Sequence, residues 1–71
     1  MKDNFNVTLG SVMKAIREKK NITQPEAAAK LGVSKMTISH WETGARAMTA
    51  KNLSEYCNVL GVSIQSVFER M

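Results

Sequence analysis

The stretch that decides the fold is TQPEAAAKLGVSKMTISHWETG, residues 23–44. It reads as two short helices joined by a tight turn. Thr23, followed three residues later by Glu26, has the pattern of a helix N-terminal capping box. Gly32 and Gly44 stand where a left-handed residue ends a helix, and Ser34 is a good N-cap for the second helix. A turn this short forces the two helices to cross steeply and touch.

The outward face of the second helix decides between a plain helical hairpin and one that binds a ligand. At about 100° per residue, the side opposite Ile38 and Trp41 carries short or mobile hydrogen-bond donors and no carboxylate. Its members are Met36, Ser39, His40 and Thr43, with Lys35 and Thr37 beside them. A solvated face more often carries Glu and Lys in i, i+4 pairs. Because the DNA major groove admits one helix and presents acceptors and thymine methyl groups, this face predicts the recognition helix of a helix-turn-helix.

Length and composition limit the possible functions. Seventy-one residues make one small domain, and a net charge of +4 favours a polyanionic partner. The single Cys57 excludes an internal disulfide, and no apolar run reaches the ~20 residues of a membrane span. Without a signal-peptide core, a cytoplasmic protein with no membrane partner is expected. Paired carboxylates, a Cys/His arrangement and a phosphate-binding glycine loop are missing, so neither an enzyme, a metal nor a cofactor is predicted.

The flanking sequence predicts three more helices. Residues 1–7 carry no periodicity and are expected to form a short arm, on the body or on DNA, with the domain itself at residues 8–71. Apolar residues at helical spacing predict a helix from about Thr8 to Lys20. A fourth helix is expected from its N-cap Thr49 to about Leu60, and a last helix from Ser63. The expected fold is all-α, with five helices in one compact domain.

The order and spacing of these features resemble the phage repressor and Cro type of helix-turn-helix, the large Xre-like family. The resemblance is carried by Leu9-Gly10 with Arg17, Thr23-Gln24 with Glu26, Leu31-Gly32-Val33-Ser34, Thr37-Ile38-Ser39, Trp41-Glu42 with Gly44 and Arg46, and Leu60-Gly61-Val62-Ser63 before Phe68. It implies a lambda-repressor-like domain and a sequence-specific regulator of transcription, a repressor or Cro-like protein, that binds double-stranded DNA. Two positions depart from the family: Met48 stands where Pro is common, and Ala27 where Leu is preferred.

The resemblance also implies roles for individual residues. Base contacts are expected from Lys35, Met36 and His40, with Thr37 and Ser39 as secondary readers. Phosphate contacts are expected from Thr23, Gln24, Thr43, the backbone around Ala45, Arg46 and Lys51. Arg17 and Glu42 match a pair that ties the first helix to the end of the third. Two alternatives stay open: Lys35 could be solvated or bind phosphate, and His40 could be an exposed bystander.

A dimer is expected because one helix-turn-helix reads only a few base pairs, so such domains usually bind inverted repeats in pairs. The dimer seam is predicted in the C-terminal part, unless its residues complete the core: Val62, Ile64, Val67, Phe68 and Met71. Two other functions use the same fold. One is an antitoxin or partner-binding module with a protein partner, and the other is a controller protein of a restriction system.

Overall fold

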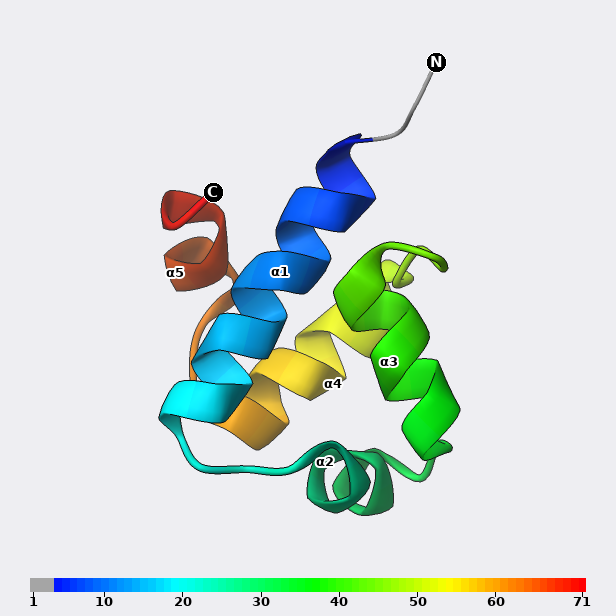
Figure 1. The fold of residues 1–71 in the computed structure, drawn as a ribbon. Coiled ribbons are helices and arrows are strands. Elements are labelled where there is room, and N and C mark those ends of the chain that lie inside the picture. The colour runs from blue at the N-terminus through cyan, green and yellow to red at the C-terminus, as the bar shows by residue number, and fades with distance from the viewer. Residues whose placement is uncertain (1–3) are drawn as a thin grey trace.

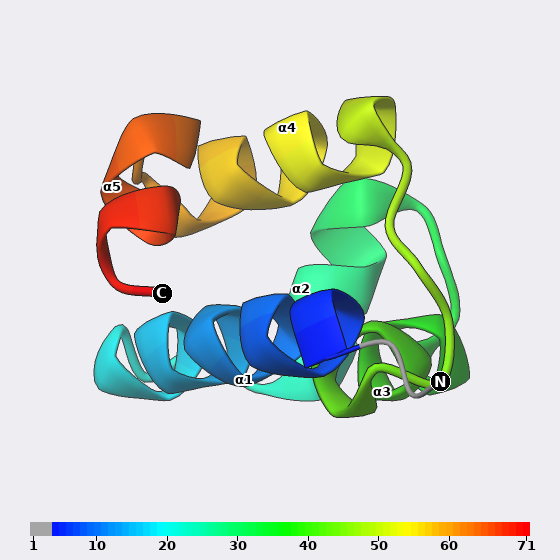
Figure 2. The same ribbon diagram turned by 90° about the horizontal axis from the view of Figure 1, so that it is seen from above.

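A computed structural model of the chain describes residues 4–71, which form five helices and no strand. They are α1 (Asn4–Lys19), α2 (Gln24–Leu31), α3 (Lys35–Thr43), α4 (Ala50–Leu60) and α5 (Ile64–Glu69). In Figure 1, α3 lies beside α1 on one side and α5 on the other. Seen from above, α1 and α3 form one layer and α4 and α5 the other, with α2 crossing between them (Figure 2). The all-α, five-helix expectation is confirmed. Among the described residues, no helix is long and apolar enough to cross a membrane.

Both helices of the helix-turn-helix begin and end at the capping residues that the sequence predicted. The Thr23 hydroxyl accepts a hydrogen bond from the Glu26 amide at 3.2 Å, and the Glu26 carboxylate accepts one from the Thr23 amide at 2.8 Å. Ser34 caps α3 by accepting from the Thr37 amide at 3.1 Å. Gly32 and Gly44 end their helices with φ of 70° and 82°, a left-handed conformation that glycine adopts without steric cost. The turn between α2 and α3 is therefore fixed by local interactions.

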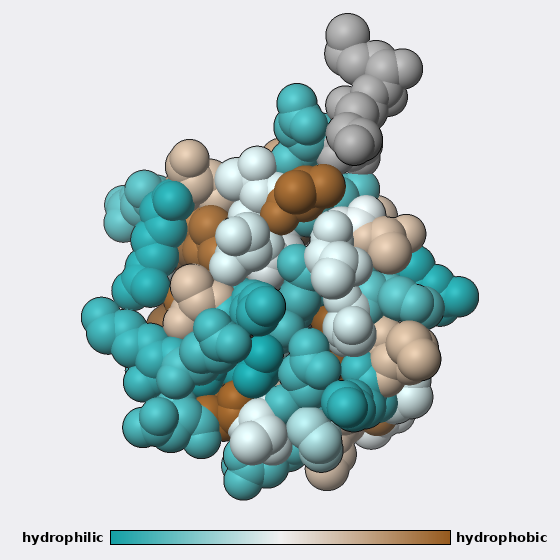
Figure 3. Space-filling view, viewed as in Figure 1, coloured by the Kyte–Doolittle hydropathy of each residue, from teal (hydrophilic) through white to brown (hydrophobic). Residues whose placement is uncertain are grey.

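The core is built from the apolar stripes of all five helices. Its buried members are Leu9, Met13, Ile16, Ala27, Ala28, Ile38, Trp41, Leu53, Tyr56, Cys57, Leu60 and Val67. Hydrophilic side chains cover most of the face over the later turns of α1, whereas hydrophobic surface gathers near its first turns and beside α5 (Figure 3). α3 packs closely against α1 and α2 but not against α4. The backbone of α3 is therefore positioned mainly by α1 and α2.

The start of α1 differs from the sequence prediction. The helix begins at Asn4 instead of about Thr8, so residues 4–7 of the expected arm are helical, and residues 1–3 lie outside the described part. Phe5 places its ring 6.5 Å from the ring of Phe68 in α5. Val7 lies against Gly44, where an added Cβ would be 2.8 Å from the Val7 backbone. These contacts give the first turn tertiary partners, which periodicity within residues 1–7 could not reveal.

Two further features of the packing bear on the site. Gly10 is where α1 crosses the end of α3: a Cβ added there would be 2.7 Å from the Glu42 carbonyl oxygen, so only glycine fits. In α5, Val67 is 0 % exposed, whereas Phe68 and Met71 are 47 % and 41 % exposed. Val67 is therefore part of the core of its own chain, which fits the alternative to a dimer seam that the sequence left open. Helical spacing placed it on the right stripe but could not say how deeply that stripe is buried.

Candidate nucleic-acid interface

The outward surface of α3 brings together the five residues expected to read bases. Lys35 and Met36 are exposed, the latter to 62 % of its surface, and Thr37, Ser39 and His40 are half-buried. The Thr37 hydroxyl also contacts the Ser34 hydroxyl at 3.0 Å, so part of its hydrogen-bonding capacity is used by the cap. The surface combines one cation, an imidazole, two hydroxyls and a thioether.

The residues expected to bind phosphate lie at both ends of this surface. After α3, the loop turns back so that the Arg46 amide donates to the His40 carbonyl at 3.1 Å, which leaves the Arg46 and Ala45 side chains exposed. Thr43 is exposed and donates weakly to the same carbonyl at 3.4 Å. At the other end, Thr23 is exposed, but its hydroxyl already serves the capping box.

Two members of the predicted phosphate set have other partners. Lys51 in α4 is exposed and lies 3.9 Å from a Glu55 carboxylate oxygen, a surface pair of small energetic weight. Gln24, at the start of α2, is half-buried and donates from its amide nitrogen to Glu42 Oε1 at 3.0 Å. Gln24 therefore has an inward contact that competes with the phosphate contact expected of it.

A surface hollow separates the end of α1 from the start of α2 and opens beside Lys35. Its volume is ≈ 440 Å³. The residues lining it are Arg17, Glu18, Asn21, Ile22, Thr23, Gln24, Pro25 and Lys35. The hollow is thus bordered by the α2 N-terminus and by one cation of the reading surface, an arrangement suited to an anionic group.

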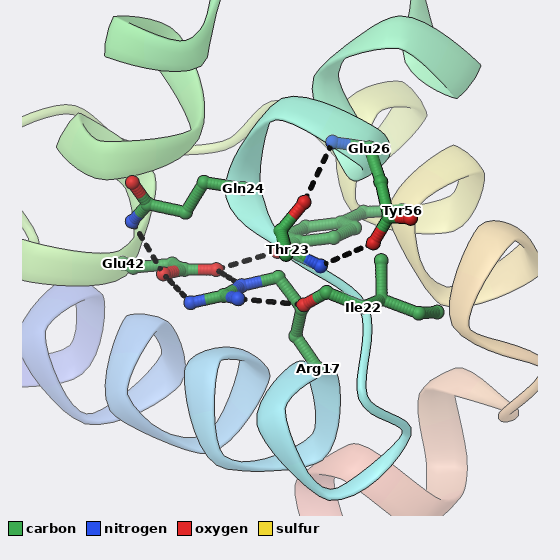
Figure 4. A network of polar contacts seen from close by, with 7 residues as sticks. All are labelled: Arg17, Ile22, Thr23, Gln24, Glu26, Glu42 and Tyr56. Carbon is green, nitrogen blue, oxygen red and sulfur yellow. Dashed lines mark hydrogen bonds and ion pairs between the residues drawn. The ribbon is translucent and has the colours of Figure 1, made fainter.

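Beneath the reading surface, a buried polar network is centred on the Glu42 carboxylate (Figure 4). Arg17 donates from Nε to Oε2 at 2.7 Å and from a terminal nitrogen to Oε1 at 3.1 Å, as the expected pair. Tyr56 donates its hydroxyl to Oε2 at 2.6 Å, and Gln24 completes the set at Oε1. A further Arg17 nitrogen donates to the Ile22 carbonyl at 2.7 Å. One carboxylate of α3 thereby joins α1, α2 and α4.

The network fixes the charge states of its members. Burial by itself would raise the pKa of Glu42, but the hydrogen bonds from Arg17, Tyr56 and Gln24 outweigh it and leave the pKa below its usual value. The hydrogen bond to Glu42 raises the pKa of Arg17, and burial, together with the same carboxylate, raises the pKa of Tyr56. At neutral pH the site holds a carboxylate, a guanidinium and a neutral phenol. No buried side-chain polar atom in residues 4–71 lacks a partner.

Sequence reasoning missed two contributors to this site. Helical spacing places Tyr56 on the apolar stripe of α4, but a buried tyrosine hydroxyl usually needs a hydrogen-bond partner, and that need is the signal in the sequence. Gly10 was noted only as a family feature. A glycine inside an otherwise regular helix costs about 1 kcal/mol relative to alanine, which signals a close approach by another backbone. Tyr56 and Gly10 both contact Glu42, which is distant from each of them in the sequence.

The chain is similar to helix-turn-helix regulators in sequence and in fold. A helix-turn-helix family model matches residues 13–67. The clp gene regulator ClgR from Corynebacterium glutamicum is 28 % identical, with a TM-score of 0.88, over 90 % of this chain and 82 % of that chain. The wild-type restriction-modification controller protein C.Esp1396I is 30 % identical, with a TM-score of 0.88, over 97 % of this chain and 91 % of that one.

The same controller has also been solved as a tetramer in complex with its natural 35 base-pair operator. That structure is 30 % identical, with a TM-score of 0.87, over 97 % of this chain and 91 % of that chain. A search of the curated proteins found no match. Within residues 4–71, no group of His, Cys, Asp and Glu side chains could hold a metal ion.

Proposed function

The chain belongs to the Xre/Cro-like helix-turn-helix family of DNA-binding transcription regulators, and we propose that α3 is the helix with which it reads double-stranded DNA. The observation that carries the proposal is the chemistry of the exposed surface of α3. Glu42, the single acid of this helix, is buried and accepts four hydrogen bonds, so it presents no negative charge to a ligand. The side chains of α3 that remain exposed can donate hydrogen bonds to the acceptors of a DNA major groove and can contact its methyl groups.

Each reading residue has a role that follows from its chemistry. Lys35 donates to guanine O6 and N7, and Met36 makes an apolar contact, for example with a thymine methyl group. His40 donates to a guanine acceptor or to a phosphate. Thr37 and Ser39 are secondary readers because they are half-buried and short.

Phosphate contacts flank the reading surface and set its register on the duplex. Arg46 is the main contact, because its loop holds it exposed beside the end of α3 and its planar fork suits phosphate. Thr43 and the Ala45 backbone act beside it. Thr23 and Gln24 act at the α2 N-terminus, and Lys51 farther away.

A second copy of the chain is needed to read a full operator. The domain measures 33 × 24 × 21 Å, so one copy covers no more than about one turn of duplex, which is ~34–36 Å long. We place the seam of a homodimer at the exposed Phe68 and Met71, with Phe5 beside them and the half-buried Val62 and Ile64 at its edge. Because it acts on DNA, we place the protein in the cytoplasm.

The decisive experiment is selection from a random duplex library at physiological salt, followed by sequencing of what the purified protein retains. The expected product is an inverted repeat with half-sites about one helical turn apart. Retention without a consensus that disappears as salt rises would overturn sequence-specific reading and leave only charge-driven binding. In that case a protein partner would become the primary ligand.

The dimer is tested separately with Phe68→Glu, which places a charge in the seam without entering the core. Sedimentation should show a monomer, and the selected site should shrink to one half-site. Gln65→Glu adds the same charge at an exposed position of α5 outside the seam and should leave the dimer intact. Equal effects of the two variants would contradict this seam.

A restriction-system controller is the second candidate, favoured by the 30 % identity to C.Esp1396I over nearly the whole chain. A controller would activate as well as repress. A promoter reporter carrying the selected operator distinguishes the two: activation at low protein and repression at high protein indicates a controller, whereas repression at every concentration indicates a simple repressor.

A further inference from the structure

Tyr56 in α4 contacts two consecutive residues in the last turn of α3. Its hydroxyl donates to Glu42 Oε2 at 2.6 Å, and its ring lies 6.0 Å from the Trp41 ring at an interplanar angle of 43°. The Tyr56 side chain is 0 % exposed. The backbone of α3 lies closer to α1 and α2 than to α4, and the Tyr56 side chain spans the distance from α4 to α3.

The two contacts restrain rotation of α3 about its own axis. Trp41 and Glu42 are adjacent, so their side chains leave the helix about 100° apart, and a helix held at two such points cannot turn freely. A rotation of about 10° would move a side-chain tip, at about 5–6 Å from the axis, by about 1 Å. Hydrogen bonds to base edges do not tolerate such a displacement.

The other members of the network cannot replace this restraint. Arg17 and Gln24 reach Glu42 from α1 and α2, the helices that already pack against α3. Tyr56 reaches the same carboxylate from α4 (Figure 4). Tyr56 therefore adds a restraint on α3 from outside this three-helix group.

We propose that Tyr56 is a positioning residue for DNA recognition: by holding Glu42 and Trp41, it sets the rotation of α3 and hence the position of its reading surface. The inference rests on the proposed function, because rotation affects recognition only if α3 reads bases. It assigns a role in sequence preference to a residue that touches no ligand.

The test compares Tyr56→Phe with the natural chain on the selected operator and on a scrambled duplex, at a temperature where both proteins are fully folded. Phenylalanine keeps the ring on Trp41, and Arg17 still serves Glu42 Oε2, so no buried charge loses its last partner. The preference for the operator should fall about fivefold, within the range typical of coupled residues that do not touch the ligand. The slope of affinity against salt should not change.

The matched control is Cys57→Ala, which also weakens α4. Cys57 is buried next to Tyr56 in the sequence but takes no part in the network. It should lower the free energy of unfolding and leave the operator preference unchanged. If Tyr56→Phe behaved in the same way, losing stability but keeping the full preference, Tyr56 would be a structural residue only and the inference would be overturned.

A measurement without DNA separates this inference from the proposed function. Residual dipolar couplings of backbone N–H groups report helix orientation, and in Tyr56→Phe those of α3 should depart from the natural values while those of α1 and α2 keep theirs. Unchanged α3 couplings would overturn the inference. If the natural chain preferred no duplex at all, the proposed function would fail, and the couplings alone would decide whether Tyr56 orients α3.

Discussion

The two ends of α3 differ in burial and in the contacts that they make. In its last turn, Trp41 and Glu42 are buried, and side chains from α1, α2 and α4 converge on them. In its first turn, Lys35 and Met36 are exposed, and the polar contacts come from the cap residue Ser34. The difference teaches that one nine-residue helix has a buried end that holds the fold together and an exposed end that is free to contact a ligand.

The largest expected effect comes from removing the carboxylate at the buried end. Glu42→Ala leaves Arg17 buried without its partner, so the free energy of unfolding should fall by about 3–5 kcal/mol. Urea denaturation at pH 7 measures this loss. Glu55→Ala is the control, because its pair with Lys51 is exposed and contributes less than about 1 kcal/mol. Similar losses in both variants would contradict the special role of the buried end.

Acid should reduce the contribution of the Glu42 network to the free energy of unfolding. The pKa of Glu42 is lowered in the folded chain from an ordinary value of 4.5, so its contribution to stability is present above pH 4.5 and is lost as pH falls through the lowered pKa. The gap in unfolding free energy between the natural chain and Glu42→Gln should therefore narrow between pH 7 and pH 3. A gap that stays constant would show that ionised Glu42 does not stabilise the fold.

Gly10→Ala tests the backbone crossing at the buried end. Alanine in place of glycine inside a helix normally stabilises it by about 1 kcal/mol. Here the new Cβ would be 2.7 Å from the Glu42 carbonyl oxygen, so a net loss of about 1–3 kcal/mol is expected. Ser11→Ala, one residue on and exposed, should change stability by less than about 0.5 kcal/mol. Stabilisation by Gly10→Ala would mean that α1 and α3 can separate at no cost.

A substitution at the exposed end of α3 should change DNA binding and leave the free energy of unfolding nearly unchanged. Lys35→Ala should leave the unfolding free energy within about 0.5 kcal/mol. Binding to the best operator should weaken by about 1–3 kcal/mol, and the preferred sequence should change, because the variant loses a donor to base edges. Library selection with the variant measures both quantities.

Arg46→Ala is the matched control for Lys35→Ala, since each removes one exposed cation near α3. It should weaken all sites alike and reduce the salt slope by about one, as expected of a phosphate contact. An unaltered ranking of sites in Lys35→Ala would contradict the assignment of Lys35 to base reading. An altered ranking in Arg46→Ala would contradict the assignment of Arg46 to phosphate.

The local features of the fold could be predicted from sequence, and the long-range ones could not. Thr23, Ser34 and Gly32 act through the adjoining turn, so their residue types suffice to place helix ends. The Tyr56–Glu42 hydrogen bond joins positions 14 residues apart on two different helices, and no spacing rule predicts it. The start of α1 at Asn4 likewise depends on Phe68 in the last helix.

The same difference between local and long-range features applies to the reading surface on α3. Its residues could be named because helical spacing places them opposite Ile38 and Trp41, and their contacts with bases stay predictions. The inward contact of Gln24 escaped notice because a helix N-terminus near DNA predicts a phosphate contact equally well.

The exposure of Lys35 and Met36 has a consequence for how such a protein can change over evolutionary time. Side chains that contribute little to folding can be exchanged freely, so a new operator preference can arise by substitution on this surface without a compensating change elsewhere. The positions of the buried network depend on one another, because Arg17, Gln24 and Tyr56 all donate to the same Glu42 carboxylate. A library randomised at the exposed positions of α3 should therefore yield folded proteins with many different specificities, whereas the same library at the network should yield almost none.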